Sequence, residues 1–271
     1  MKKVKFINVS TKNLIMDLKL LSQTKDNISF RIIGTNHVFV NTLRRLITEE
    51  VPTLAIEEVT FIKNSSALYD EMIALRLGLI PLKTDLKSYV FQEQAKNESD
   101  PRTFLNFKLK TKGPINVYAS DLQSQDPKVQ PVHQKILIVK LLKDQELELE
   151  AKAILGRGKQ HSKFIPALAY YGYTSKVNVK NKDPSEFKEK YPSVIFDKSG
   201  KIDSKLINTS ELIDACKNIN NNIIEVTYEK DSFDFSLESW GQLEIKEIFK
   251  EAVSIFEEKL DSFEKEIKKL K

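Results

Sequence analysis

Apolar and polar residues alternate in several segments near both ends of the chain and in its middle. This two-residue period is typical of half-buried β-strands. The alternation is most regular where Leu147, Leu149, Ala151 and Ala153 fall on one face. We predict strands at residues 3–8, 13–20, 28–33, 56–64, 135–142, 147–155, 222–230 and 232–239.

Two helices are predicted in the first third of the chain, where apolar residues recur every three or four positions. Residues 34–36 form a turn and a helix N-cap, and Pro52 ends the helix that follows. A second, short helix is predicted at residues 69–82, ended by Gly78 and Pro81. The apolar face of the first helix consists of Val40, Leu43, Ile47 and Val51.

A long helix is predicted from about Leu243 to the end of the chain. Its apolar residues follow each other in steps of three and four, which makes a narrow, nearly heptad seam suited to packing against another helix. These residues are Ile245, Phe249, Ala252, Phe256, Leu260, Phe263, Ile267 and Leu270.

The order of these elements predicts an α+β fold in which both chain ends cooperate in one αβ domain and the middle is an insertion. Residues 83–103 and 112–132 are polar and are predicted as loops between strands. Residues 173–221 are rich in Lys, Asn, Asp and Ser with only short apolar runs, so we expect a small appended module there.

The charge balance favours a solvated surface over a nucleic-acid groove. The 271 residues include 43 basic and 38 acidic side chains, for a net charge of +5, and only six of the basic residues are Arg. Arg makes the bidentate contacts that read bases and phosphates, whereas Lys interspersed with Glu covers ordinary surfaces. One cysteine and the lack of a long apolar run predict a cytoplasmic protein with no membrane segment.

No pattern for catalysis or metal binding emerges from the residues. The three histidines are outside any HExxH arrangement, and nothing local pairs one of them with Cys216. Residues 156–159 lack the GxxxxGK[ST] spacing of a phosphate loop, so a turn is the simpler interpretation. The adjacent pairs Glu49-Glu50 and Glu57-Glu58 point to different faces. We therefore expect no catalytic, metal-binding or cofactor-binding residues.

Four blocks of sequence, in order, resemble the alpha-type subunits of cellular RNA polymerases. The first is NTLRRLITEEVP at 41–52, and the second is Asp70-Glu71 followed by LRLGLIPL at 75–82. The third runs from Gly156 through Gly158, His161 and Lys163 to Pro166, and the fourth from Phe235 to Gly241. Among these subunits the chain is most similar to the archaeal D subunit, because of the extra module before the last strands.

The resemblance implies a division into domains. Residues 1–52 and 222–271 would form the dimerisation domain, residues 53–172 an inserted mostly-β domain, and residues 173–221 a ferredoxin-like module. Many D subunits carry an iron–sulfur cluster in that module, which needs about four thiolates. Only Cys216 remains here. We therefore expect a module without a cluster, held by an apolar core of Val194, Ile195, Phe196, Leu212 and Ile213, with Cys216 buried on a helix.

The resemblance also implies a function as a non-catalytic assembly subunit of the nucleotidyltransferase complex. It would form a heterodimer with the L subunit and dock the large catalytic subunits, meeting DNA only through the complex. The implied dimer interface comprises Val40, Leu43, Ile47, Phe249, Ala252, Phe256, Leu260, Phe263 and Ile267. The implied large-subunit contacts are Asn41, Arg44, Arg45, Glu71, Arg76, Lys159, His161 and Lys163.

Four alternatives remain open at this point, two for the roles of residues and two for the function. The apolar stripes could cover the chain's own sheet, and the arginines could be ordinary solvated residues. A stand-alone nucleic-acid-binding protein is a second functional class, disfavoured by scarce Arg, a single Trp and the lack of an RNA-recognition motif. A single-chain enzyme is a third, disfavoured by the empty search for a site.

Overall fold

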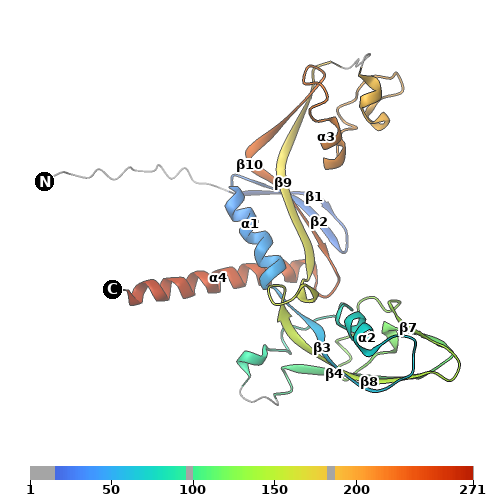
Figure 1. Ribbon diagram of the computed structural model, residues 1–271. Helices are drawn as coiled ribbons and strands as arrows, with labels where there is room; N and C mark the ends of the chain where they lie inside the picture. Colours follow the sequence, from blue (N-terminus) through green and yellow to red (C-terminus); the bar gives the residue numbers. More distant parts are fainter. Residues whose placement is uncertain (1–15, 96–99, 182–186, 271) are drawn as a thin grey trace. The chain divides into compact units, whose positions relative to one another are not determined.

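A computed structural model describes residues 16–95, 100–181 and 187–270 (Figure 1). The predicted strand at 3–8 and the start of the one at 13–20 lie outside these residues. The chain divides into two compact units. The first contains the described residues up to Leu21 together with Phe30–Val40 and Tyr171–Phe235, and the second contains Ser22–Ser29, Asn41–Tyr170 and Ser236–Lys271.

The fold mixes helices with antiparallel sheets, as the sequence predicts. The helices are α1 (His37–Arg45), α2 (Asp70–Gly78), α3 (Ser210–Cys216) and α4 (Ile245–Lys269). The strands are β1 (Asp17–Gln23), β2 (Asn27–Ile33), β3 (Pro52–Asn64), β4 (Phe104–Lys112), β5 (Ile115–Tyr118), β6 (Gln123–Ser124), β7 (Leu137–Leu141), β8 (Glu146–Arg157), β9 (Ala167–Val179) and β10 (Ile224–Ser239).

The largest sheet of the second unit has the strand order β3-β8-β4-β6. The predicted alternation of β8 is confirmed, because its four alternating apolar residues are all buried. They join a core to which α2 contributes Ile73 and Leu77. The segment 112–132 is not a plain loop as predicted, since it contains β5 and β6. These strands are too short for a period of two to be visible in the sequence.

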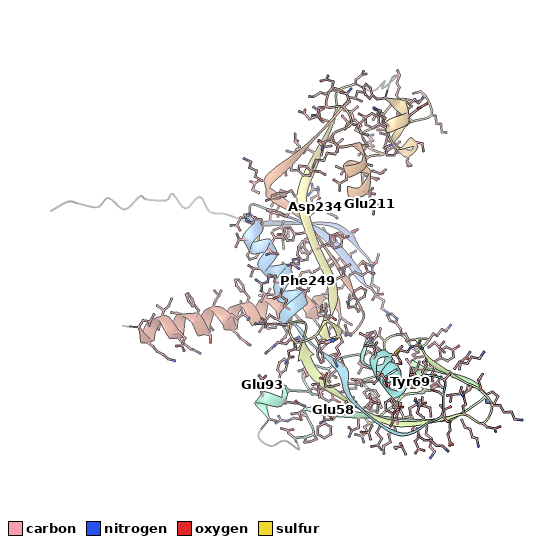
Figure 2. The ribbon with its side chains drawn as sticks, in the orientation of Figure 1. Glu58, Tyr69, Glu93, Glu211, Asp234 and Phe249 are labelled. Atoms are coloured by element: carbon pink, nitrogen blue, oxygen red, sulfur yellow. The ribbon has the colours of Figure 1, made fainter. Side chains whose placement is uncertain are left out.

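The second sheet has the strand order β1-β2-β10-β9. Its strand β10 is one element of sixteen residues, where the sequence predicted two strands on either side of Asp231. The strand continues through Asp231 because β10 is an inner strand with a partner strand on each side. Pairing with these neighbours therefore determines its length, and the local strand propensity does not. Across this sheet Arg31 donates two hydrogen bonds to Asp234, at 2.6 and 3.0 Å (Asp234 is marked in Figure 2).

The first predicted helix exists, but its last turn is wider than expected. The Asn36 side chain accepts a hydrogen bond from the Phe39 backbone N–H at 3.0 Å, which confirms the predicted N-cap. After Arg45 the chain makes a π-helical turn, Leu46–Glu50, in which the Val51 N–H bonds to the Leu46 carbonyl at 3.1 Å. Such turns are rare in proteins as a whole, and those that occur often lie at functional sites.

The module near 173–221 has a small apolar core of its own. Ile195 and Cys216 are fully buried, and Phe196, Leu212 and Ile213 pack against them. Cys216 lies on α3 as predicted, and burial raises the pKa of its thiol. The prediction for Val194 was wrong, because this side chain is exposed in the middle of the short 3-10 turn Ser193–Ile195, whose buried position is taken by Ile195.

Candidate subunit-docking site

The π-helical turn after α1 is in direct contact with the glycine-containing loop after β8. The Lys159 backbone N–H donates to the Glu49 carbonyl at 3.0 Å. A Cβ atom on Gly158 would lie 1.9 Å from the Thr48 carbonyl oxygen, so only glycine allows this approach of the two backbones. A Cβ atom on Gly156 would come within 2.6 Å of the Phe164 ring. Both glycines are thus explained by close packing.

The same loop is fastened to β3 by Lys163 and Phe164. The Phe164 carbonyl accepts a hydrogen bond from the buried Thr53 hydroxyl at 2.8 Å. The Lys163 ammonium donates to the Ile56 carbonyl at 2.9 Å and forms an ion pair with Glu57. Glu57 is the extra residue of a β-bulge in β3, which explains why its side chain can reach this position. Only 12% of the Lys163 side chain is exposed.

The segment between β10 and α4 contacts the same region. We call the place where this segment meets the π-helical turn, β3 and the loop after β8 the junction. The Trp240 N–H donates to the Pro166 carbonyl at 3.1 Å, and the Thr84 N–H donates to the Gln242 carbonyl at 2.9 Å. Between Trp240 and Gln242 the chain turns at Gly241, whose φ is +86° and which lies against Val132. Thr84 in turn accepts a hydrogen bond through its hydroxyl from the β3 backbone at 3.0 Å. Segments from all four resembling blocks, or directly next to them, therefore meet in one place.

Cationic side chains gather around Glu49 on the outside of the junction. Arg45 donates two hydrogen bonds to the Glu49 carboxylate, at 3.1 and 2.9 Å, and is itself 60% exposed. These bonds lower the pKa of Glu49, and the charges of Arg44 and Lys159 act in the same direction. Arg44 also donates to the Asn41 side chain at 3.1 Å. One carboxylate thus faces three cations, which leaves a positive surface accessible to a partner.

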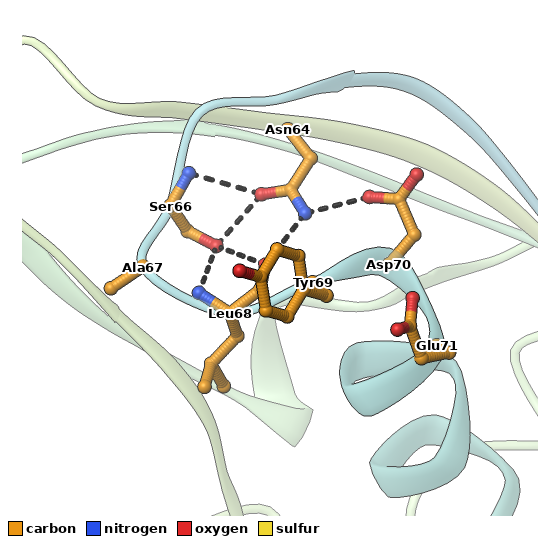
Figure 3. A pocket seen from close by; sticks show the side chains of 7 residues that line it. All are labelled: Asn64, Ser66, Ala67, Leu68, Tyr69, Asp70 and Glu71. Carbon is orange, nitrogen blue, oxygen red and sulfur yellow. Dashed lines mark hydrogen bonds between the residues drawn. The ribbon is translucent and has the colours of Figure 1, made fainter.

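A second exposed surface lies on α2 and the turn before it. The Arg76 guanidinium donates to the Ile138 carbonyl of β7 at 2.7 Å, while Glu71 is exposed in the first turn. A shallow, open pocket precedes the helix, and its polar groups bond to one another, as between Asn64 and Asp70 at 2.7 Å (Figure 3). Exposed apolar side chains lie on α2 and at its two ends, namely Tyr69, Met72, Leu75 and Leu79.

The long helix α4 is buried at its start and exposed at its end. Ile245, Ile248 and Ala252 are buried, and the helix packs against the π-helical turn, where Lys259 bonds to Glu50 at 2.9 Å. All residues from 260 to 270 are exposed. In Figure 1 this part of α4 extends away from β3, β4 and β8 of the same unit.

Comparison with known proteins identifies the group to which this junction belongs. Residues 57–171 match the family described as RNA polymerase Rpb3/RpoA insert domain. The chain is 36% identical to the DNA-directed RNA polymerase subunit Rpo3 of Pyrococcus horikoshii, over 94% of this chain and 99% of the relative. The Rpo3 subunit of Methanosphaera stadtmanae is 34% identical, over 91% of this chain and 97% of the relative. The chain belongs to the Rpo3 family of DNA-directed RNA polymerase subunits. The resemblance inferred from the four blocks is thereby confirmed.

The residues predicted to contact large subunits fall into three groups in this Rpo3-family chain. Arg44, Arg45 and Lys159 lie around Glu49, and Asn41 accepts a hydrogen bond from Arg44. Exposed His161 lies on the same loop as Lys159, and its Nδ1 accepts the Lys163 N–H at 3.1 Å. Glu71 and Arg76 lie on α2. Lys163 alone points inward, to Glu57 and the Ile56 carbonyl.

Burial also divides the residues predicted for the dimer interface. Val40, Ile47 and Ala252 are fully buried within the chain itself, and Leu43, Phe249 and Phe256 are half-buried. The exposed members are Leu260, Phe263 and Ile267. Thus the apolar face of the first helix mostly packs within the chain's own fold. The exposed apolar residues of the predicted interface lie at the end of α4.

Sequence reasoning did not find the packing roles of the residues that hold the junction together, notably Thr53, Glu57 and Gly158. The GxG spacing at 156–158 was the available signal, since paired glycines often mark close backbone approach. In the ranges that the structure covers, no three His, Cys, Asp or Glu side chains gather as a metal-binding group. In those ranges there is also no helix with the length and apolar character needed to cross a bilayer.

Proposed function

We propose that this Rpo3-family chain is the non-catalytic assembly subunit of its RNA polymerase. It forms a heterodimer with the small L subunit, and this pair docks the two large catalytic subunits. The single observation that carries the pairing is the end of α4, where Leu260, Phe263 and Ile267 are exposed, whereas the apolar side chains of Ile245, Ile248 and Ala252 near its start are buried. A row of exposed apolar side chains on a folded helix is stabilised when a partner covers it.

The proposed domain division follows the resemblance. Residues 1–52 and 222–271 form the dimerisation domain, residues 53–172 the inserted mostly-β domain, and residues 173–221 the ferredoxin-like module. The match of residues 57–171 to the insert-domain family supports the second of these boundaries. The four-block junction supports a fixed attachment of the insert, because it ties β3 and the loop after β8 to the helices.

Large-subunit docking is assigned to the positive surface around Glu49 and to α2. Asn41, Arg44, Arg45, Lys159 and His161 supply the first, and Glu71 and Arg76 the second. Exposure and charge support this for Arg45, which makes its only described ion pair within its own helix. Lys163 acts indirectly, because its ammonium is used inside the chain and holds the loop that carries Lys159 and His161.

The ferredoxin-like module is proposed to be without an iron–sulfur cluster. Its core consists of isoleucines, Tyr191 and the single buried Cys216, and one thiolate falls short of the about four that a cluster requires. The test is iron analysis and visible absorbance of the protein purified without oxygen. Stoichiometric iron with broad visible absorbance would contradict this proposal.

Co-expression with a candidate L subunit tests the central proposal. We expect a stable 1:1 complex, which then binds the large subunits. Arg45→Ala should leave the pairing with L intact and weaken incorporation into the polymerase. Arg102→Ala is the matched control, since Arg102 is similarly exposed and makes the same two-bond pair with Asp100.

Two outcomes would count against the proposed function. One is equal incorporation of the Arg45 and Arg102 variants, which would remove Arg45 from the docking surface. The other is a lone chain that shifts nucleic acid at physiological salt and ignores L, as a stand-alone nucleic-acid-binding protein would. Membership in the Rpo3 family does not favour that alternative.

A further inference from the structure

The ring of His161 acts as the N-cap of a short 3-10 turn in the loop after β8. The turn spans Ser162–Phe164, and Nδ1 of His161 accepts a hydrogen bond from the Lys163 backbone N–H at 3.1 Å. A ring nitrogen that accepts such a bond carries no proton. In the neutral ring the proton is therefore on Nε2, so this one hydrogen bond fixes the tautomer.

The backbone of His161 is also bonded within the loop. Its N–H donates to the Arg157 carbonyl at 3.4 Å, and its carbonyl accepts the Phe164 N–H at 3.1 Å. The only polar group of the residue that is left over is the Nε2–H. The side chain is exposed, and its Nε2 has no hydrogen-bond partner among the described residues. His161 thus presents one N–H donor to whatever binds this loop.

The loop that carries this donor is held on two sides. The Lys163 ammonium and the Phe164 carbonyl are both bonded to β3, at 2.9 and 2.8 Å. The Lys159 backbone N–H is bonded to the π-helical turn at 3.0 Å. The Nε2–H is therefore in place before a partner arrives, and a donor that is already ordered loses little conformational entropy on binding.

The charges near this donor favour a carboxylate as the acceptor. Lys159 lies two residues before His161, and together with Arg44 and Arg45 it acts on the carboxylate of Glu49. Three cations and one carboxylate leave a net charge of +2 on this surface, and an N–H bonds more strongly to a charged acceptor than to a neutral one. A row of phosphates fits less well, because the lowered pKa keeps Glu49 ionised and like charges repel.

We infer that His161 donates its Nε2–H to a carboxylate of a large catalytic subunit. This inference rests on the proposed assembly function and names the chemical group that the docking surface recognises. His161 is then a residue that determines specificity. A partner with an amine in that place would set two donors against each other, which penalises the wrong partner.

Two substitutions separate the roles of the two ring nitrogens. In His161→Asn the side-chain carbonyl takes the place of Nδ1 and still accepts the Lys163 N–H, as in an Asx turn, but the outer donor is lost. In His161→Gln the amide reaches the place of Nε2, and the cap is lost. We expect His161→Asn to keep the melting temperature and to bind the large subunits about tenfold more weakly. We expect His161→Gln to melt lower and to keep most of the affinity.

Affinity is measured as uptake of the complex with L by rising concentrations of the large subunits. His133→Asn is the matched control, since His133 is also exposed and lies in the same unit, and its ring makes no hydrogen bond among the described residues. This control should leave uptake unchanged. Nitrogen NMR of the histidine side chains in the full chain reads the tautomer directly, and we expect the proton of His161 on Nε2.

The outcomes separate this inference from the function on which it rests. Equal uptake of wild type and His161→Asn, or a proton on Nδ1, would overturn the inference and leave the assembly function standing. An equal loss in His161→Asn and His161→Gln would overturn it as well, because the ring and not its donor would then be needed. If His161→Asn abolished a nucleic-acid shift by the complex with L and left uptake unchanged, the acceptor would be a phosphate. A wild-type complex that the large subunits do not take up would remove the proposed function itself.

Discussion

The outer face of the sheet β3-β8-β4 and the distal half of α4 are both open to solvent, but their chemistry is opposite. On the sheet, charged residues of facing strands pair directly, as Lys108 with Glu150 at 2.7 Å and Lys110 with Glu148 at 2.9 Å. On α4 the exposed positions include a row of apolar side chains, Leu260, Phe263 and Ile267, which nothing in the described part of the chain covers. The charges of the sheet face are thus paired within one chain, whereas the apolar row on the helix is the surface that we propose is covered by another chain.

The largest effect should come from placing a charge in the α4 seam. Phe263→Glu should raise the Kd for the L subunit at least about a hundredfold, because a carboxylate would be buried without a partner. The melting temperature of the lone chain should not change, since this side chain is mostly exposed. Isothermal titration and thermal denaturation measure the two quantities.

Ile62→Glu provides the control for that substitution. Ile62 lies on β3 and is 59% exposed, close to the value for Phe263. A similar loss of L binding in both variants would mean that the effect is not specific to α4. The contrast between the two solvent-facing regions would then have no functional meaning.

The next largest effect is on stability and concerns the junction, where the π-helical turn packs against the loop after β8. Gly158→Ala places a methyl group against the Thr48 carbonyl and should destabilise the fold by about 1–3 kcal/mol, as overpacking does. Gly172→Ala is the control, because a Cβ atom there meets nothing within 4 Å. Chemical denaturation of both variants checks the difference. Equal stability would show that the loop after β8 is not held against the π-helical turn.

The parts of the fold that could be predicted are those in which one chain segment decides its own structure. The alternation of β8 is of this kind, since burial follows directly from a local period, and the steps of three and four in α4 predict the helix itself. The continuity of β10 through Asp231 could not be predicted, because it depends on the strands on both sides. The same holds for the π-helical turn, which is fixed by contact with the loop at Gly158.

The sequence indicated some side chains that lie together in the candidate site but not how they pack. The blocks at 41–52 and 156–166 pointed to Arg45 and Lys159, which do lie together around Glu49. Nothing in the sequence indicated that Lys163 turns inward, because its position depends on a β-bulge at Glu57, on a distant strand. Bulges leave no regular signature in a sequence, since they interrupt the period by which strands are recognised.

A smaller effect is expected from a single hydrogen bond in the junction. Thr53→Val keeps the shape of the side chain but removes the hydroxyl that donates to the Phe164 carbonyl. We expect a loss of about 1–2 kcal/mol in the free energy of unfolding, since a buried acceptor is left unpaired. Thr60→Val on the same strand is exposed and should cost far less. If the two variants were equally stable, the Phe164 carbonyl would not depend on Thr53.

The smallest effect belongs to the charged sheet face. Lys110→Glu sets a carboxylate opposite Glu148 and should lower stability slightly at low salt, because like charges facing each other across strands repel. The loss should disappear in about 1 M salt, where screening acts over roughly 3 Å. Lys143→Glu, in the exposed turn between β7 and β8, makes the same change in net charge and is the control. A salt-independent loss in Lys110→Glu alone would mean that this face is packed and not merely paired. The sheet face would then be a second candidate for binding a partner. The difference between a sheet face paired within the chain and an uncovered α4 would no longer hold.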